Sequence, residues 1–169
     1  MIEEKNTYRE ESGDLAEKMM GSFLARVLHL ENLMNNIMTQ HFCSADAERA
    51  ALFLSSITPD MSFRNRINIF INMVIIYYDE IYKTHDSDLR KLYELDKYRN
   101  DLVNLVIFDS EQVLNKNDTD TVQSLKSVNR KSTMGEATRK EHETKVLLCI
   151  KLAAILNTIQ REITLSKLS

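Results

Sequence analysis

One arginine in the middle of the chain lies where a charge could do chemistry. Arg99 falls in the middle of a predicted helical face whose apolar residues recur at three- and four-residue spacing, namely Leu92, Leu95, Leu102 and Val106. A guanidinium keeps its proton inside a protein, and burying it without a partner costs several kcal/mol. We therefore expect Arg99 to meet an acid, a partner chain or a solvent-filled cleft, and it is the first candidate for a functional residue.

A structural role for Arg99 is the alternative. Its aliphatic stem could pack in the core while its head reaches water, or it could pair with an acid such as Glu31 or Asp96. Arginines at apolar positions are more often packed and paired than functional, so the residue pattern alone favours this structural role.

Other chemistry has little support in the sequence. No histidine has a glutamate three residues before it, which excludes the Glu-x-x-His pairs of a di-iron bundle, and three scattered glycines cannot build a phosphate-binding loop. We expect neither metal nor cofactor, packed and reduced thiols, and each histidine at the surface or a helix end. These residues are Cys43, Cys149, His29, His41, His85 and His142.

Length and composition predict a single all-α domain over residues 1–169. With three glycines, one proline and abundant Leu, Ile, Met, Lys and Glu, the chain has few breaks and a strong helical preference. The formal charge of −3 gives no global basic footprint, so any nucleic-acid contact must be local. The polar start and interrupted apolar stretches predict a cytoplasmic protein without a membrane segment.

Periodicity predicts five helices, separated by turn residues and by one long polar segment. Residues 1–12 are expected to form a disordered tail, and residues 115–137 a loop with one or two short extended pieces. The third helix is apolar nearly all round, which favours a homodimer through the third or fourth helix. The first three helices are expected over about residues 14–41, 45–56 and 62–83, with Ala50, Ala51 and Leu54 facing inward on the second. The fourth is expected from a cap at Asp86 or Ser87 to just before Lys116, and the fifth from about residue 138 almost to the C-terminus.

A local basic cluster surrounds the end of the predicted loop. Its functional interpretation is a rim that faces phosphate, and the alternative, which charge alone favours, is a solvated loop face. The rim consists of Lys126, Arg130, Lys131 and Arg139.

The segment around Arg99 resembles the Arg-Asn-x-x-x-His signature of the HEPN superfamily, the helical domains named for higher-eukaryote and prokaryote nucleotide binding. The matching string is Tyr98-Arg99-Asn100-Asp101-Leu102-Val103-Asn104. The segment 62–70 resembles the family's opening of the preceding helix. Residues 122–129 and the last helix resemble the loop and final helix that succeed the signature in the family. The resemblance covers roughly residues 52–163 in order and spacing.

The resemblance implies a bundle of four or five helices and a homodimer whose two signatures face each other across a cleft. Active members are metal-independent ribonucleases that use the Arg and the His of the signature. Arg99 matches the Arg and Asn100 the polar residue after it, but Asn104 stands in place of the His. An amide has no proton to exchange near neutral pH, so we expect a member that binds through Arg99, Asn100, Asp101 and Asn104 without cutting.

Three functions are compatible with these residues. The first is a catalytically degenerate HEPN-like dimer that binds RNA, a nucleotide or a protein partner, in a defence or toxin–antitoxin setting. The second is an active endoribonuclease whose acid–base role has moved to another residue. The third is a helical interaction protein in which Arg99 is purely structural.

Overall fold

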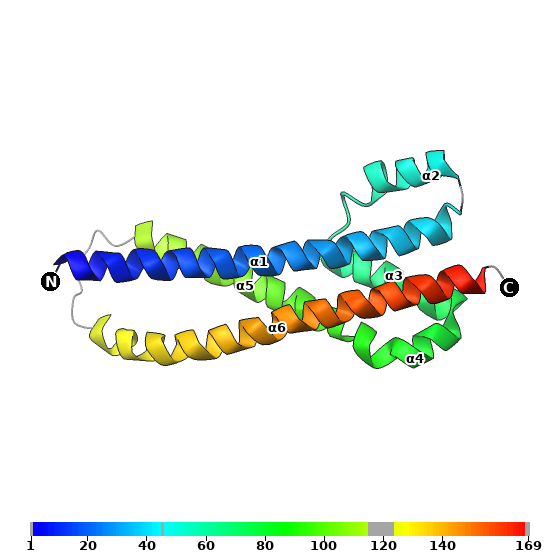
Figure 1. The fold of residues 1–169 in the computed structure, drawn as a ribbon. Coiled ribbons are helices and arrows are strands. Elements are labelled where there is room, and N and C mark those ends of the chain that lie inside the picture. The colour runs from blue at the N-terminus through cyan, green and yellow to red at the C-terminus, as the bar shows by residue number, and fades with distance from the viewer. Residues whose placement is uncertain (1, 45, 115–123, 168–169) are drawn as a thin grey trace. The chain divides into compact units, whose positions relative to one another are not determined.

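The protein is all α-helical, as the sequence predicts. The computed structural model describes the backbone except at residues 1, 45, 115–123 and 168–169, and it describes side chains within residues 18–44, 46–102 and 139–167. Within the described backbone there are helices and no strand (Figure 1). The elements are α1 (Ile2–Phe42), α2 (Ala47–Leu52), the π-helical η1 (Phe53–Ile57), α3 (Phe63–Tyr77), α4 (Asp79–Leu89), α5 (Lys91–Leu114) and α6 (Ser124–Ser166).

The chain divides into two compact units. The first comprises residues 1–24 and 98–147, and the second comprises residues 25–97 and 148–169. Arg99, Asn100, Asp101, Asn104 and the basic rim belong to the first unit. One domain over 1–169 stays a prediction.

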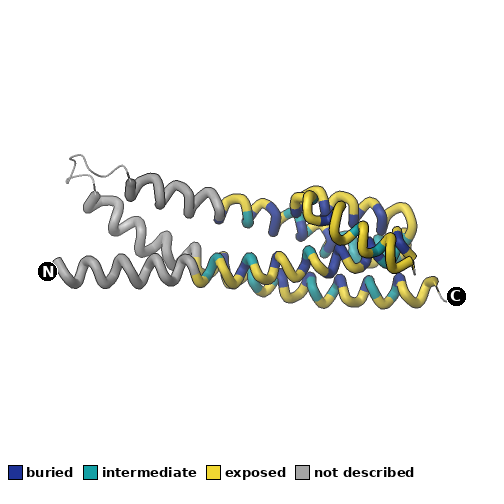
Figure 2. Tube along the Cα trace, turned by 90° about the horizontal axis from the view of Figure 1, so that it is seen from above, coloured by how far each residue is buried: buried dark blue, intermediate teal, exposed yellow. Residues whose placement is uncertain are grey.

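The predicted apolar stripes form the core of the second unit. The α1 stripe is buried from Val27 to Ile37, and the α6 stripe is buried at every fourth or third position around Ile159 (Figure 2). Each fully buried Leu or Ile stabilises the fold by about 1.5–3 kcal/mol relative to an exposed one. The core contains Leu30, Met34, Ile37, Ile67, Phe70, Val74, Leu92, Leu95, Leu152, Leu156, Ile159 and Ile163.

The predicted third helix is two helices in the structure. α3 begins as predicted, where the Ser62 hydroxyl accepts the backbone N–H of Asn65, but it ends at Tyr77. Tyr78 leaves the helical conformation, with φ −141° and ψ 51°, and its hydroxyl lies 2.8 Å from Nδ1 of His41. α4 starts at once with Asp79 and Glu80, acids that favour a helix N-terminus.

The expected cap of the fourth helix was wrong. α4 continues through Asp86 and Ser87 to Leu89, and α5 begins at Lys91. The Asp86 carboxylate instead accepts the side-chain Nε–H of Arg90, one turn later, at 2.8 Å and 3.0 Å.

Two further helix boundaries and the burial of the second helix differ from the prediction. α1 begins at Ile2, so the segment expected as a tail is helical, and α6 begins at Ser124, so the second half of the expected loop is helix rather than extended pieces. The polar residues there include no proline, and one glycine costs a helix only about 1 kcal/mol. The short second helix turns none of its residues into a buried position, contrary to expectation for Ala50, Ala51 and Leu54.

In the described residues, no helix is both long and apolar enough to cross a membrane, in agreement with the sequence.

Candidate functional site

Arg99 lies on α5 at a half-buried position. Leu92, Leu95 and Leu102 are buried, so the predicted apolar face exists, and Tyr98 is buried with them. Arg99 itself is half-buried, which corrects the expectation of a buried position on this face. The two acids named as possible partners each form an ion pair with another arginine: Glu31 with Arg66 and Asp96 with Arg64.

The residues after Arg99 follow the polar side of α5. Asn100 and Asp101 are exposed, so the structure brings three of the four predicted ligand-binding residues onto one turn. The side chain of Asn104 lies outside the described residues, as do those of Lys126, Arg130 and Lys131. Arg139, the remaining residue of the predicted rim, is exposed on α6.

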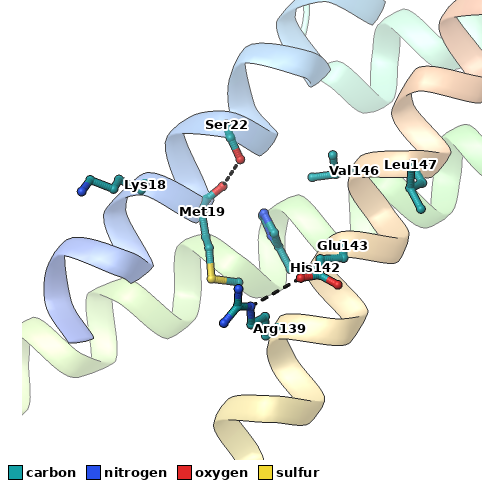
Figure 3. A pocket seen from close by; sticks show the side chains of 8 residues that line it. All are labelled: Lys18, Met19, Ser22, Arg139, His142, Glu143, Val146 and Leu147. Carbon is teal, nitrogen blue, oxygen red and sulfur yellow. Dashed lines mark hydrogen bonds and ion pairs between the residues drawn. The ribbon is translucent and has the colours of Figure 1, made fainter. Parts of the chain in front are cut away.

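A shallow groove of about 510 Å³ lies in the first unit, between α1 and α6 (Figure 3). Its α1 side carries a lysine, a methionine and a serine, and its α6 side carries Arg139 and a histidine one turn later. The lining residues are Lys18, Met19, Ser22, Arg139, His142, Glu143, Val146 and Leu147. The groove therefore combines an apolar lining with cations on both sides.

His142 is the buried polar residue of this groove, with 4% of its surface exposed. Its Nδ1 lies 3.1 Å from the hydroxyl of Tyr98, the neighbour of Arg99 in sequence. The ring of Phe23 packs edge-on against Tyr98 at 5.0 Å between centroids and against His142 at 6.2 Å. Burial lowers the pKa of His142 and raises that of Tyr98, so both groups are uncharged at neutral pH.

Arg139 and Glu143, two charged residues of the groove, form a weak ion pair. Arg139 Nε lies 3.4 Å from Glu143 Oε1, and both side chains are largely exposed, so the pair contributes little to stability. The Ser22 hydroxyl donates to the carbonyl of Met19 at 2.9 Å (Figure 3). The geometry favours holding an anionic group beside apolar atoms over activating a nucleophile.

Arg66, in the second unit, is buried, with 5% of its surface exposed. Its Nε donates to Asn35 Oδ1 at 2.8 Å, its Nη2 donates to the carbonyl of Thr58 at 2.7 Å, and its Nη1 lies 3.2 Å from Glu31 Oε2. Three partners satisfy the guanidinium, which is what a buried charge requires. We assign Arg66 a structural role.

The position of Arg66 on an apolar helical face could have been recognised in the sequence. It lies three residues after Phe63 and four before Phe70, both of which are buried, so it shares their helical face. Arg66 is buried on its apolar face, whereas Arg99 is half-buried on its own.

The thiols and acids show no metal chemistry. Within the described residues, no group of three His, Cys, Asp or Glu side chains is placed to hold a metal ion. Cys43 and Cys149 are free and buried, as expected, and burial raises the pKa of the Cys149 thiol to about 11. Such a thiol stays protonated and unreactive at neutral pH.

Comparison of the chain with protein-family models, curated proteins and solved structures found no match.

Proposed function

We propose that this chain is a non-catalytic, HEPN-like helical domain that forms a homodimer and binds single-stranded RNA at the α5 surface around Arg99. The observation that supports it most is the half-buried position of Arg99 beside exposed Asn100. A long side chain whose stem is packed is held in place, and a guanidinium held in place can donate two parallel hydrogen bonds to a phosphate. Asn100 offers donors and an acceptor to a base.

The proposed lack of catalysis follows from the absence of a well-placed residue for proton transfer. Asn104 cannot exchange a proton near neutral pH, and His142 is the one histidine in the sequence of the first unit. His142 is buried and hydrogen-bonded to Tyr98, which leaves it poorly placed to reach a 2′-hydroxyl.

The homodimer is supported by apolar residues on α3 that the second unit does not cover. Ile69, Ile75 and Ile76 are exposed on this helix. Exposed isoleucines on a single helix face are typical of an interface.

One observation favours an active ribonuclease as the second candidate. His142 lines the same groove as Lys18 and Arg139, so a neutral imidazole lies among cations that could hold a phosphate. In that case His142 would have taken the acid–base role that Asn104 lost.

The test is binding of a fluorescently labelled single-stranded RNA pool, measured by anisotropy, with a gel of the same samples to detect cleavage. We expect retention of intact RNA, and an Arg99→Gln affinity about tenfold lower, because one charge-assisted phosphate contact is lost. Arg161→Gln, an exposed arginine on α6, is the matched control and should bind normally.

Three outcomes decide between the candidates. Cleavage that disappears in His142→Asn would replace this proposal with the ribonuclease. Binding of a labelled mononucleotide without binding of the RNA pool would identify a nucleotide as the ligand. No binding of either one, with Arg99→Gln less stable than the native protein, would leave Arg99 with a structural role.

A further inference from the structure

The groove between α1 and α6 has an apolar part that opens to the surface (Figure 3). Met19 and Val146 are half-buried in its lining, and Leu147 has 66% of its surface exposed. All the lining residues belong to the first unit. The volume of about 510 Å³ lies in the range of small-molecule sites, which is about 300–1,000 Å³. A ligand of that size would cover aliphatic groups that otherwise lie in water.

The charged part of the lining favours an anion. Lys18 on α1 and Arg139 on α6 are exposed cations, and Glu143 is the acid among the described lining residues, so one positive charge is in excess. The ion pair of Arg139 with Glu143 is 3.4 Å long and largely exposed, so a ligand can replace it at little cost. One excess positive charge matches a head group with a single negative charge.

His142 can offer this head group a hydrogen-bond donor. Its ring lines the groove and is held in place, since Nδ1 lies 3.1 Å from the Tyr98 hydroxyl and 4% of the residue is exposed. Within the described residues, Nε2 of His142 has no hydrogen-bond partner. When Nδ1 accepts from the Tyr98 hydroxyl, Nε2 carries the proton of the neutral ring and needs an acceptor. An anion in the groove would be that acceptor.

The apolar side chains favour an alkyl chain over a nucleobase as the rest of the ligand. A base is held without sequence readout chiefly by stacking on an aromatic side chain. Among the described lining residues the one ring is that of His142, which is almost wholly buried and packs against Phe23. Met19, Val146 and Leu147 offer aliphatic groups and a flexible thioether, which adapt to a methylene chain.

We propose that this groove binds an alkyl carboxylate. The carboxylate lies between Lys18 and Arg139 and accepts Nε2–H of His142. The alkyl chain covers Met19 and Leu147. This site goes beyond the proposed RNA binding on α5 and does not depend on it.

The test is isothermal titration calorimetry of the full chain with sodium decanoate, kept below the concentration at which it forms micelles. We expect saturable binding of one decanoate per chain. Hexanoate should bind about tenfold more weakly or worse, because its shorter chain buries less apolar surface. Decylamine has the same chain with a positive head and should not bind, because the excess charge of the groove repels it.

Two pairs of variants locate the site. Arg139→Gln should weaken decanoate binding by about tenfold, because a charge-assisted contact is lost, and Arg161→Gln, also an exposed arginine on α6, is its control. Leu147→Ser should weaken it by a similar factor, and Leu165→Ser is the control, since Leu165 is 65% exposed on the same helix. All four positions are exposed, so the helical circular dichroism should stay the same.

Nitrogen NMR of histidine-labelled protein tests the role of His142. Decanoate should shift the ring signals of His142 and leave it with a protonated Nε2 and an unprotonated Nδ1. The signals of His29, which is exposed on α1 and does not line the groove, should stay unchanged. Decanoate binding without any change at His142 would overturn its role as donor.

The other outcomes are equally decisive. No decanoate binding, or equal binding of decylamine, would overturn the alkyl carboxylate as ligand. Equal losses in Leu147→Ser and Leu165→Ser would overturn the location. A mononucleotide that binds in place of decanoate, and is lost in Arg139→Gln, would replace the proposal with a phosphate site. Arg99→Gln should bind decanoate normally, so a failure of RNA binding is distinguishable from a failure of this site.

Discussion

At the scale of single residues, the buried charge of Arg66 is the strongest structural prediction. Arg66→Ala would leave Glu31 without this ion pair and Asn35 Oδ1 without this donor, and the Thr58 carbonyl would keep the backbone N–H of Met61 but lose the guanidinium. We expect a loss of about 3 kcal/mol in the free energy of unfolding, measured by urea denaturation. Arg49→Ala, whose ion pair with Asp46 is exposed, is the control and should lose less than about 1 kcal/mol. Equal losses in the two variants would contradict the structural assignment of Arg66.

His142 makes stability depend on pH in a defined direction. Burial lowers its pKa from the ordinary value of 6.5, so near pH 6 the unfolded chain binds more protons than the folded one. Stability from this group is therefore complete above pH 6.5 and is lost as the pH falls through the folded pKa. We expect His142→Asn to flatten the slope of unfolding free energy between about pH 7 and 5. His29→Gln, at an exposed position, should leave it unchanged, and an unaltered slope in His142→Asn would be a contradiction.

The sequence identified the right kind of residue, an arginine on an apolar helical face, but it singled out Arg99 rather than Arg66. A charged residue on an apolar helical face does mark a special position, but two arginines fit that description, and Arg66 is the one that is buried, with three polar partners. Those partners lie on α1 and in the segment before α3, so the spacing of Arg66 within its own helix could not identify them. The expectation that His142 lies at the surface or a helix end was wrong, because α6 begins well before it, at Ser124, and its partner Tyr98 lies 44 residues away in the sequence.

At the scale of elements, the break between α3 and α4 depends on one hydroxyl. Tyr78→Phe removes the hydrogen bond to His41 Nδ1 and should cost about 1 kcal/mol of unfolding free energy in urea. Tyr77→Phe is the matched control, since that tyrosine is exposed and its ring, rather than its hydroxyl, contacts His41. A loss in Tyr77→Phe as large as in Tyr78→Phe would show that the hydroxyl of Tyr78 does not stabilise the break.

Helical periodicity predicted the core elements because their burial repeats along the chain. The apolar stripes of α1, α3 and α6 could be identified without knowing which elements pack against them. The exposure of α2 and η1 and the break at Tyr78 could not be predicted this way, since apolar residues at 50–57 have the same spacing whether they face a core or solvent. The sequence of 78–80 also contains no glycine or proline to indicate an interruption.

At the scale of the whole molecule, two identical chains would bring two copies of the signature surface to one RNA. The proposed likeness to the HEPN superfamily implies a homodimer whose two signatures face each other across a cleft, where active members use the Arg and the His of the signature. With asparagine at 104, both copies keep the arginine and lose the titratable group. The dimer would then hold RNA without cutting it.

The substitution Asn104→His tests this interpretation, because it should give the protein a ribonuclease activity that the native chain lacks. An imidazole from one copy can take the proton of a 2′-hydroxyl, whose oxygen attacks the phosphorus, while the imidazolium of the other copy protonates the departing 5′-oxygen. Products should carry 2′,3′-cyclic phosphate and 5′-hydroxyl ends, and should form in the presence of EDTA. The rate should be at least about 100-fold above that of the native chain, an acceleration of the size that positioned acids and bases supply. Asn100→His, one turn earlier on α5, is the matched control and should stay inactive. Robust cleavage by the native chain that Arg99→Ala abolishes would show instead that the site never lost its chemistry.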